Sequence, residues 1–298
     1  MKDQAERLRL MAKNLKTRIE NDMVKGMNHT RVIVVTSGKG GVGKTNLALN
    51  LSLAMAENGI RTILLDADMG LANVDIILGV VPKYNLYHVV LGEKTIKEIV
   101  IKGPYDLKII PGGSGIQELA NLPEETLKRV ISELERLDGE CDLMIIDTGA
   151  GISNSVVSFL LAGDDIIVVT TPEPTSITDA YGIIKAASSR RARGLIYIVV
   201  NRVSMETEGI LVAQKLVSVA EKFLGVEVRP LGHMVEDPAI ERAVKNQEPF
   251  LLAYPNSQAA NNIRAIARKI CEVCFEEKTA PRASGLRSFF RNLTSFMR

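Results

Sequence analysis

A glycine-rich segment near the start of the chain has the residue types and spacing needed to bind phosphate groups. Residues 38–45 read Gly-Lys-Gly-Gly-Val-Gly-Lys-Thr, which matches the pattern G-x-x-x-x-G-K-[ST]. An apolar run ends just before the segment, and a helical pattern begins at Lys44. Glycines let backbone N–H groups converge on phosphate oxygens, and the helix N-terminus adds the positive end of its dipole. We therefore predict a nucleotide phosphate site, with Lys44 on the β- and γ-phosphates and the Thr45 hydroxyl on Mg²⁺.

Three aspartates stand where short apolar runs end. Asp66 and Asp68 follow one run, and Asp147 follows another. Ligands of open α/β sheets bind at the carboxyl ends of the strands, so these side chains are expected beside the phosphates. An apolar run that ends in Asp is typical of a carboxylate that holds Mg²⁺, directly or through water. We predict Thr45, Asp66 and Asp147 as the magnesium site.

Apolar runs alternate with helical patterns along the chain. The runs are short and nearly continuous, as in strands buried on both faces, and lie at residues 32–35, 62–65, 107–110, 143–146, 166–169 and 195–200, with a shorter one at 226–231. The helical patterns lie at 45–57, 124–137, 175–189, 206–224 and 256–276. This alternation predicts a doubly wound, mostly parallel α/β sheet of the P-loop NTPase type. We expect an N-terminal helix at 1–25, the sheet domain at 26–277, and a linker with a terminal helix at 278–298.

Composition and charge narrow the class of protein. The 298 residues include no Trp and only 4% aromatic residues, so the core must be aliphatic. Three cysteines without a signal-peptide pattern favour a reducing compartment, and no stretch approaches the roughly 18 apolar residues that cross a bilayer. Both ends are basic: residues 1–25 carry seven Lys/Arg and four Asp/Glu, and residues 282–298 carry four Arg and no acid. The body is therefore mildly acidic, and we expect no nucleic-acid partner.

Lys39, a second lysine inside the glycine-rich segment, sharpens this interpretation. With it, the segment resembles the deviant Walker A signature of the MinD/ParA family. Residues 66–75 resemble the MinD switch I region, residues 147–151 its Walker B and switch II, and residues 246–249 a motif near the end of the domain. The resemblance covers roughly residues 30–275.

The resemblance implies ATP and Mg²⁺ as ligands and a role for each matching residue. Two subunits would sandwich two ATP molecules, and Lys39 would reach the nucleotide of the opposite subunit, as an arginine finger does. Asp68 would orient or activate the attacking water. The implied phosphate contacts are Gly38, Lys39, Gly40, Gly41, Val42, Gly43, Lys44, Thr45 and Asn46. The implied contacts near the adenine base are Asn201, Arg202, Glu236, Asp237 and Pro238.

The N-terminal segment points to one branch of the family. Residues 3–9 read Asp-Gln-Ala-Glu-Arg-Leu-Arg and resemble the DQAxxLR element of FlhG-type (FleN/YlxH) proteins, which control flagellar number and placement. In that branch the element stimulates FlhF, a GTPase of the signal-recognition-particle type, so the implied partner contacts are Asp3, Gln4, Leu8 and Arg9. On spacing alone the segment is a basic helix with one apolar face. The alternative is a helix that packs on its own domain.

The C-terminal thirteen residues form a second amphipathic pattern. Its apolar residues make one stripe at helical spacing: Leu286, Phe289, Phe290, Leu293, Phe296 and Met297. Arg287, Arg291 and Arg298 lie off this stripe. A helix this short is marginal alone in water, but it gains apolar contacts in a membrane interface with its arginines near anionic headgroups. The alternative is a helix folded onto the domain, and the two states can alternate.

These features predict a cytoplasmic ATPase that dimerises with ATP and attaches to the inner face of the cell membrane through residues 286–298. The favoured role is regulation of flagellar assembly, with FlhF and flagellar switch (C-ring) proteins as partners. A division-site MinD protein and a DNA-partitioning ParA protein are the main alternatives. An iron–sulfur scaffold is a third, because Cys271 and Cys274 form a CxxC pair; their helical setting favours core packing instead.

Overall fold

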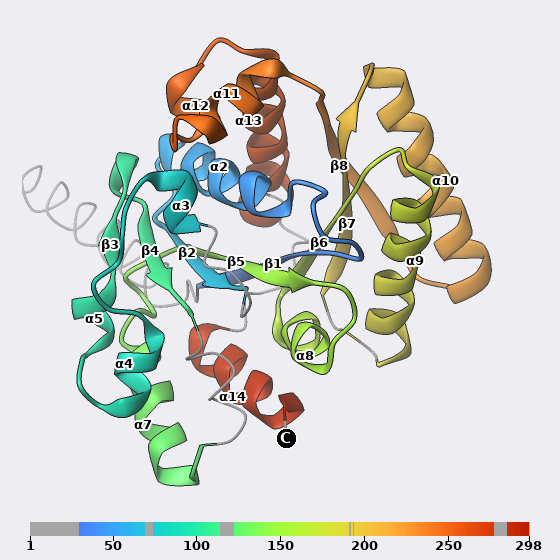
Figure 1. The fold of residues 1–298 in the computed structure, drawn as a ribbon. Helices are drawn as coiled ribbons and strands as arrows, with labels where there is room; N and C mark the ends of the chain where they lie inside the picture. Colours follow the sequence, from blue (N-terminus) through green and yellow to red (C-terminus); the bar gives the residue numbers. More distant parts are fainter. Residues whose placement is uncertain are drawn as a thin grey trace, which may run out of the picture.

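In the part of the chain that the structure describes, eight strands form one sheet in the order β3-β4-β2-β5-β1-β6-β7-β8, and only β3 runs antiparallel to its neighbour (Figure 1). The computed structural model describes residues 30–68, 74–113, 122–190, 192, 194–276 and 285–297. The predicted helix at 1–25 and the linker after residue 277 lie outside these ranges. The strands are β1 (Arg31–Ser37), β2 (Thr62–Ala67), β3 (Ile101–Lys102), β4 (Lys108–Pro111), β5 (Leu143–Ala150), β6 (Asp165–Thr170), β7 (Leu195–Val203) and β8 (Val228–Val235). The predicted doubly wound, mostly parallel sheet is confirmed.

Side chains alternate between two apolar cores along each central strand, because successive residues of a strand point to opposite faces. In β1, Val32 and Val34 belong to one core, and Ile33 and Val35 to the other. All four are almost fully buried. Covering both faces in this way requires near-continuous apolar strands, which is the pattern that the sequence shows.

Helices cover both faces of the sheet. One face is covered by α2 (Lys44–Glu57), α3 (Val74–Leu78), α11 (Pro238–Lys245), α12 (Phe250–Ala253) and α13 (Gln258–Cys271). The other face is covered by α4 (Leu86–Leu91), α5 (Ile96–Ile99), α7 (Glu124–Glu135), α8 (Asn154–Ala162), α9 (Pro174–Ser189), α10 (Glu206–Leu224) and α14 (Gly285–Met297). A 3₁₀ turn lies at Pro104–Asp106, and a π-helical turn lies at Glu272–Glu276. Among the described residues, no helix is long and apolar enough to cross a membrane.

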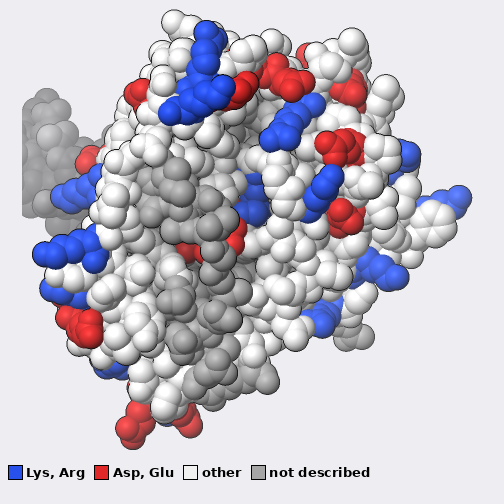
Figure 2. Space-filling view, in the orientation of Figure 1, with Lys and Arg blue, Asp and Glu red and all other residues white. Residues whose placement is uncertain are grey.

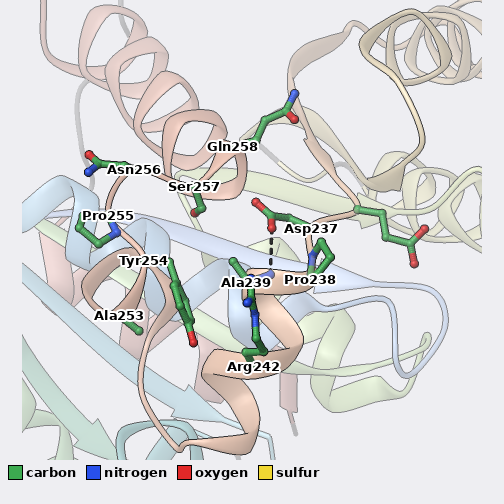
Figure 3. Close-up of a pocket in the computed structure, with 11 residues that line it drawn as sticks. Asp237, Pro238, Ala239, Arg242, Ala253, Tyr254, Pro255, Asn256, Ser257 and Gln258 are labelled. Atoms are coloured by element: carbon green, nitrogen blue, oxygen red, sulfur yellow. Dashed lines mark hydrogen bonds between the residues drawn. The ribbon is translucent and has the colours of Figure 1, made fainter.

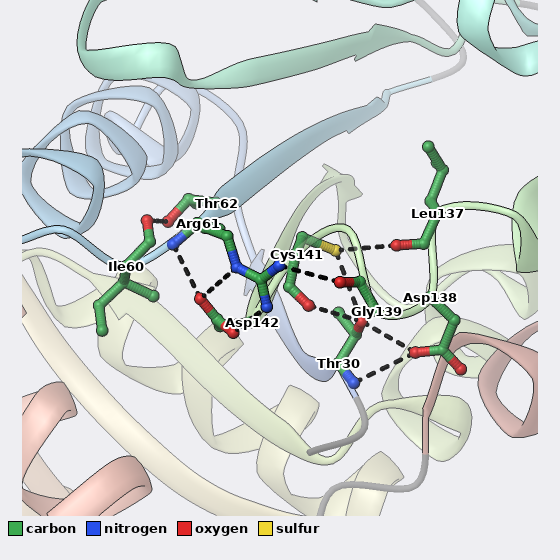
Figure 4. Close-up of polar contacts among 9 residues, drawn as sticks. All are labelled: Thr30, Ile60, Arg61, Thr62, Leu137, Asp138, Gly139, Cys141 and Asp142. Atoms are coloured by element: carbon green, nitrogen blue, oxygen red, sulfur yellow. Dashed lines mark hydrogen bonds and ion pairs between the residues drawn. The ribbon is translucent and has the colours of Figure 1, made fainter. Parts of the chain in front are cut away.

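Polar contacts connect the N-terminal ends of the strands (Figure 4). The glycine-rich segment lies at the opposite, C-terminal ends of the strands. Arg61, before β2, donates to both carboxylate oxygens of Asp142, before β5, at 3.0 and 2.6 Å. The Thr30 hydroxyl donates to the carboxylate of Asp138 at 2.9 Å. Burial raises the pKa of Cys141, beside them, to about 11, so this thiol is not a reactive nucleophile at neutral pH. These contacts fix the register of β1, β2 and β5, which carry the site at their other ends.

The terminal helix α14 is folded onto the domain, which is the state that the sequence left open as the alternative to membrane contact. Leu286, Phe289, Phe290 and Leu293 are fully buried against α7, α8 and β1. The Phe289 and Phe159 ring centroids lie 6.3 Å apart. Phe296 remains 46% exposed, and Met297 is half-buried. A short amphipathic helix needs an apolar partner, and here the domain itself provides one.

Candidate nucleotide site

The glycine-rich loop joins the carboxyl end of β1 to the N-terminus of α2, where an anion is favoured by the helix dipole. Gly41 and Gly43 have φ of 77° and 88°, in the left-handed region that favours glycine. A Cβ at Gly38 would collide with the backbone of Asp179 on α9. No acidic side chain stands in the first turn of α2 to compete with a phosphate. The loop therefore has the shape and polarity of a phosphate cradle.

The side chain of Asn201, in β7, contacts this loop and holds it in place. It lies near the end of β7, is 8% exposed, and its amide donates to the Val42 carbonyl at 2.7 Å. The same amide fills the space that a Cβ at Gly43 would occupy. The predicted base-side residue thus also fixes the backbone of the loop. Arg202, the next residue, has φ of 57° and is exposed.

Lys44 and Asp147 form a buried ion pair at the centre of the site. Lys44 Nζ lies 2.7 Å from Asp147 Oδ1, and their side chains are 6% and 0% exposed. Burial raises the pKa of Asp147, and Lys44 and the Thr45 hydroxyl oppose that rise. The other oxygen, Oδ2, is buried without a hydrogen-bond partner. An orphaned carboxylate oxygen beside the Thr45 hydroxyl is a donor set that fits Mg²⁺, a hard cation that prefers oxygen ligands.

Asp66 lies beside Asp147, because β2 and β5 are neighbours and the two residues are paired in register. Its carboxylate accepts backbone N–H groups from Asp68 at 3.1 Å and Val74 at 3.4 Å. Burial first, and then the charge of Asp147, raise the pKa of Asp66 to about 7. Asp66 is therefore held by the backbone of Asp68 and Val74 and stands near the predicted cation site.

Asp68 lies close to the end of β5. A Cβ built on Gly149 would lie 3.6 Å from Asp68 Oδ1. Gly151 has φ of 89°, and its N–H donates to the Ser37 carbonyl at 2.8 Å, which ties this turn to the end of β1. The predicted catalytic aspartate, Asp68, thus stands beside the turn that carries the predicted switch II. Residues 69–73 of the predicted switch I lie outside the described residues.

A pocket of about 790 Å³ opens beside the loop and α2, between β7 and α11. The predicted base contacts line it together with Asn46, which was predicted on the phosphate side: Asn201, Arg202, Glu236, Asp237 and Pro238. Apolar side chains that were not predicted complete it: Leu47, Met234, Ile240, Val244 and Phe250. An apolar slot next to a phosphate cradle fits a flat, largely apolar nucleotide base.

Comparison with known proteins decides the family. Residues 30–191 match the model of a family described as an AAA domain. The chain is 38% identical over 244 residues to the antiactivator FleN of Pseudomonas aeruginosa, covering 82% of this chain and 87% of that protein. It is 34% identical to the flagellum site-determining protein YlxH of Helicobacter pylori over the full length of both. The septum site-determining protein MinD of Pyrococcus horikoshii, solved with Mg-ADP, superposes with a TM-score of 0.65 at 25% identity, covering 84% of this chain and 99% of that one.

The chain belongs to the MinD/ParA family of P-loop ATPases. FleN and YlxH are similar to it over most or all of its length, as the resemblance of residues 3–9 predicted. The nucleotide and Mg²⁺ use of the family agrees with the loop, the orphaned oxygen of Asp147 and the base pocket described above.

Lys39 of this MinD/ParA-family ATPase lies at the outer edge of the phosphate loop. Its Nζ is 2.9 Å from Glu173 Oε2 and 3.5 Å from the Thr175 hydroxyl, at the start of α9. The two charged side chains are 44% and 59% exposed, so this ion pair is open to solvent. The pair pulls the pKa of Glu173 below its usual value, mainly through the hydrogen bond. Glu173 was not predicted, because nothing in its local sequence marks it as a partner for Lys39.

Asp237 has a positional role that the sequence did not reveal. One carboxylate oxygen accepts the N–H of Ala239 at 2.8 Å, which caps α11 (Figure 3). The other accepts the N–H of Ala259 at 3.1 Å, in the first turn of α13. Each oxygen thus accepts a backbone donor, so this side chain holds the wall of the base pocket.

The surface and the cysteines bear on two alternatives. Lys and Arg are interspersed with Asp and Glu on the face shown in Figure 2, and no continuous basic surface of a DNA-binding kind is visible there. Cys274 is buried, and Cys271 is half-buried. No group of three or more His, Cys, Asp or Glu side chains is placed to hold a metal within the described part of the chain. The burial of Cys274 agrees with the core packing that was favoured for the CxxC pair.

Proposed function

We propose that this ATPase is a nucleotide-controlled switch that regulates the number or placement of flagella. The observation that carries the proposal is its full-length similarity to a flagellum site-determining protein, which includes both basic ends of the chain. FleN, an antiactivator, gives a second relative on the same branch. The division-site role remains the alternative, since MinD proteins are 30–31% identical over 74–87% of this chain.

ATP would bind with its phosphates in the loop of residues 38–45 and its base in the pocket beside Asn201. Lys44 would leave Asp147 to bind phosphate oxygens, which frees the Asp147 carboxylate to hold Mg²⁺ with Thr45. The cation supplies charge neutralisation on the phosphates. Asp68 would accept a hydrogen bond from the attacking water, and Lys39 would leave Glu173 to reach the nucleotide of a second subunit. The exposure of Lys39 and the open ion pair support this exchange of partners.

Membrane attachment would require α14 to leave its groove. The buried stripe of α14 provides the apolar face, and Arg287 and Arg291 are exposed on its outer side. An ATP dimer would present two such helices, and two linked weak sites bind more tightly than one by a factor of about 10²–10⁴. We infer that the dimer binds anionic membranes and that the ADP-bound monomer keeps α14 docked.

The N-terminal segment would contact a GTPase of the signal-recognition-particle type, and the folded domain would contact switch-complex proteins. A peptide of residues 1–25 tests the first partner. It is expected to raise GTP turnover by the flagellar GTPase of the same organism, and the peptide with Asp3→Ala and Gln4→Ala is expected not to. Equal turnover with and without saturating peptide would contradict the flagellar role and favour the division-site alternative.

A further inference from the structure

The groove that holds α14 is built for one particular apolar pattern. Four buried residues of α14 fill it at positions 286, 289, 290 and 293, which are offsets of 0, 3, 4 and 7. Its walls include the apolar sides of α7 and α8, with Val130, Leu134 and Phe159 buried in the same core. The groove also has a charged rim, where Arg287 Nε lies 3.3 Å from Glu135 Oε1.

The same pattern occurs a second time in the chain. Residues 286–293 read Leu-Arg-Ser-Phe-Phe-Arg-Asn-Leu, and residues 8–15 read Leu-Arg-Leu-Met-Ala-Lys-Asn-Leu. Four positions are identical, and Lys13 takes the place of Arg291 as a basic residue. All four groove-filling positions are apolar in both segments. The match includes the arginine that would reach Glu135, because Arg9 corresponds to Arg287.

We propose that residues 8–15 occupy the α14 groove when α14 leaves it. The inference rests on the proposed function in one respect, because membrane attachment of α14 is the event that empties the groove. The sequence match is what identifies residues 8–15 as the segment that then enters it. Charge favours this occupant, since Glu135 on the rim would meet Arg9. The chain length also allows it. The fourteen residues between Leu15 and Thr30 span up to about 45 Å when extended, and α14 packs on β1, which begins at Arg31.

The two segments would compete, and α14 would be the stronger binder. Phe290 is fully buried in the groove, whereas the corresponding residue of the N-terminal segment is Ala12, which fills less of that space. Residues 8–15 would therefore be displaced while α14 is docked and retained only after it departs. Because Leu8 and Arg9 are also the proposed partner contacts, attachment of α14 to a membrane would withdraw them from the GTPase. One groove would link the two ends of the chain.

A chimaera of the full chain tests whether the N-terminal sequence fits the groove, without any membrane. Ser288→Leu, Phe289→Met, Phe290→Ala and Arg291→Lys give α14 the sequence of residues 8–15. Hydrogen exchange in α7 and α8 is expected to stay slow. A matched control introduces the same four residue types in another order, Ser288→Met, Phe289→Lys, Phe290→Ala and Arg291→Leu, which puts a charge on the buried face. It is expected to exchange at least roughly tenfold faster in α7 and α8, as in local opening. Equal, fast exchange in both variants would overturn the proposal.

A second variant tests the native segment in place. Phe289→Asp with Leu293→Asp drives α14 out of the groove, and residues 8–15 are then expected to exchange more slowly than in the unaltered chain. Adding Leu8→Asp and Leu15→Asp should abolish that protection. Fast hydrogen exchange in residues 8–15 and also in α7 and α8 would mean that the groove is empty and would overturn the proposal. If this variant unfolds, the chimaera decides the question. The proposed function is tested separately by hydrogen exchange in the unaltered chain with ATP and anionic vesicles. Slow exchange in α14 under these conditions would mean that the helix stays docked, which contradicts membrane attachment. The results for the groove would not be affected.

Discussion

Lys39 Nζ lies 2.9 Å from Glu173 Oε2 of the same chain. The lysine that is predicted to reach the nucleotide of a second subunit is thus paired within its own subunit. The two side chains are 44% and 59% exposed, and solvent-exposed pairs of this kind contribute little to stability. The pair is therefore weak enough to exchange for a phosphate partner.

Removing the charge of Glu173 should favour the dimer. Glu173→Gln is expected to strengthen ATP-dependent dimerisation roughly twofold to thirtyfold, which corresponds to the loss of one exposed ion pair in each of the two subunits. Sedimentation velocity across a concentration series measures the change. Thr175→Val, which removes only the 3.5 Å contact, serves as the control and should have a smaller effect. Weaker dimerisation of Glu173→Gln would mean that this carboxylate acts within the dimer instead.

Lys44 also stabilises the nucleotide-free fold. Lys44→Ala leaves Asp147 buried without its ion-pair partner, a change that costs about 3–5 kcal/mol where the charge persists. Because burial already raises the pKa of Asp147, protonation should reduce that cost. The double variant with Asp147→Asn is expected to recover much of the loss. Urea unfolding without nucleotide gives the free energy of unfolding of the unaltered chain, of Lys44→Ala and of the double variant. A double variant that is less stable than Lys44→Ala would contradict this interpretation of the ion pair.

The raised pKa of Asp66 predicts a fall in stability as the pH rises. The folded state holds its proton up to about pH 7, whereas an unfolded aspartate loses it near its ordinary pKa of about 4. Between these values the folded state binds more protons, so the free energy of unfolding decreases with increasing pH. Urea midpoints at pH 5.5 and 7.5, without nucleotide, should show this decrease, and Asp66→Asn should flatten it. If the urea midpoint of Asp66→Asn falls between pH 5.5 and 7.5 as much as that of the unaltered chain, another group causes the pH dependence.

The docked state of α14 predicts unequal effects for two of its phenylalanines. Phe289 is fully buried, so Phe289→Ala should lower the free energy of unfolding by about 3–5 kcal/mol. Phe296 is 46% exposed, and Phe296→Ala should change it by less than about 0.5 kcal/mol. Chemical denaturation of the two variants gives the comparison. Equal, small effects would show that α14 spends little time in its groove.

The sequence predicted the sheet because each central strand is a nearly continuous apolar run with a clear end. The runs at 32–35 and 143–146 correspond to β1 and β5, and the phosphate loop lies where the pattern placed it. The short edge strand β3 and the helices α3, α4, α5, α8, α11 and α12 were missed, because elements of two to nine residues carry little periodicity.

The site was predicted where its chemistry is local in sequence and missed where it depends on packing. Lys44 and Asp147 meet as expected, since a loop and a strand end mark them. Glu173 and Phe250 become part of the site only through the arrangement of distant elements. For α14, the amphipathic pattern was correctly identified, but a pattern alone does not distinguish a membrane from an apolar groove in the same protein.

The most direct test of the ATP switch is the molecular mass of the Asp68→Ala variant, which should bind ATP and hydrolyse it slowly. Light scattering with Mg²⁺ and ATP is expected to give twice the mass found with Mg²⁺ and ADP, and adding Lys39→Met should restore the single-chain mass in ATP. A mass that is the same in ATP and ADP, with ATP binding verified, would contradict the account.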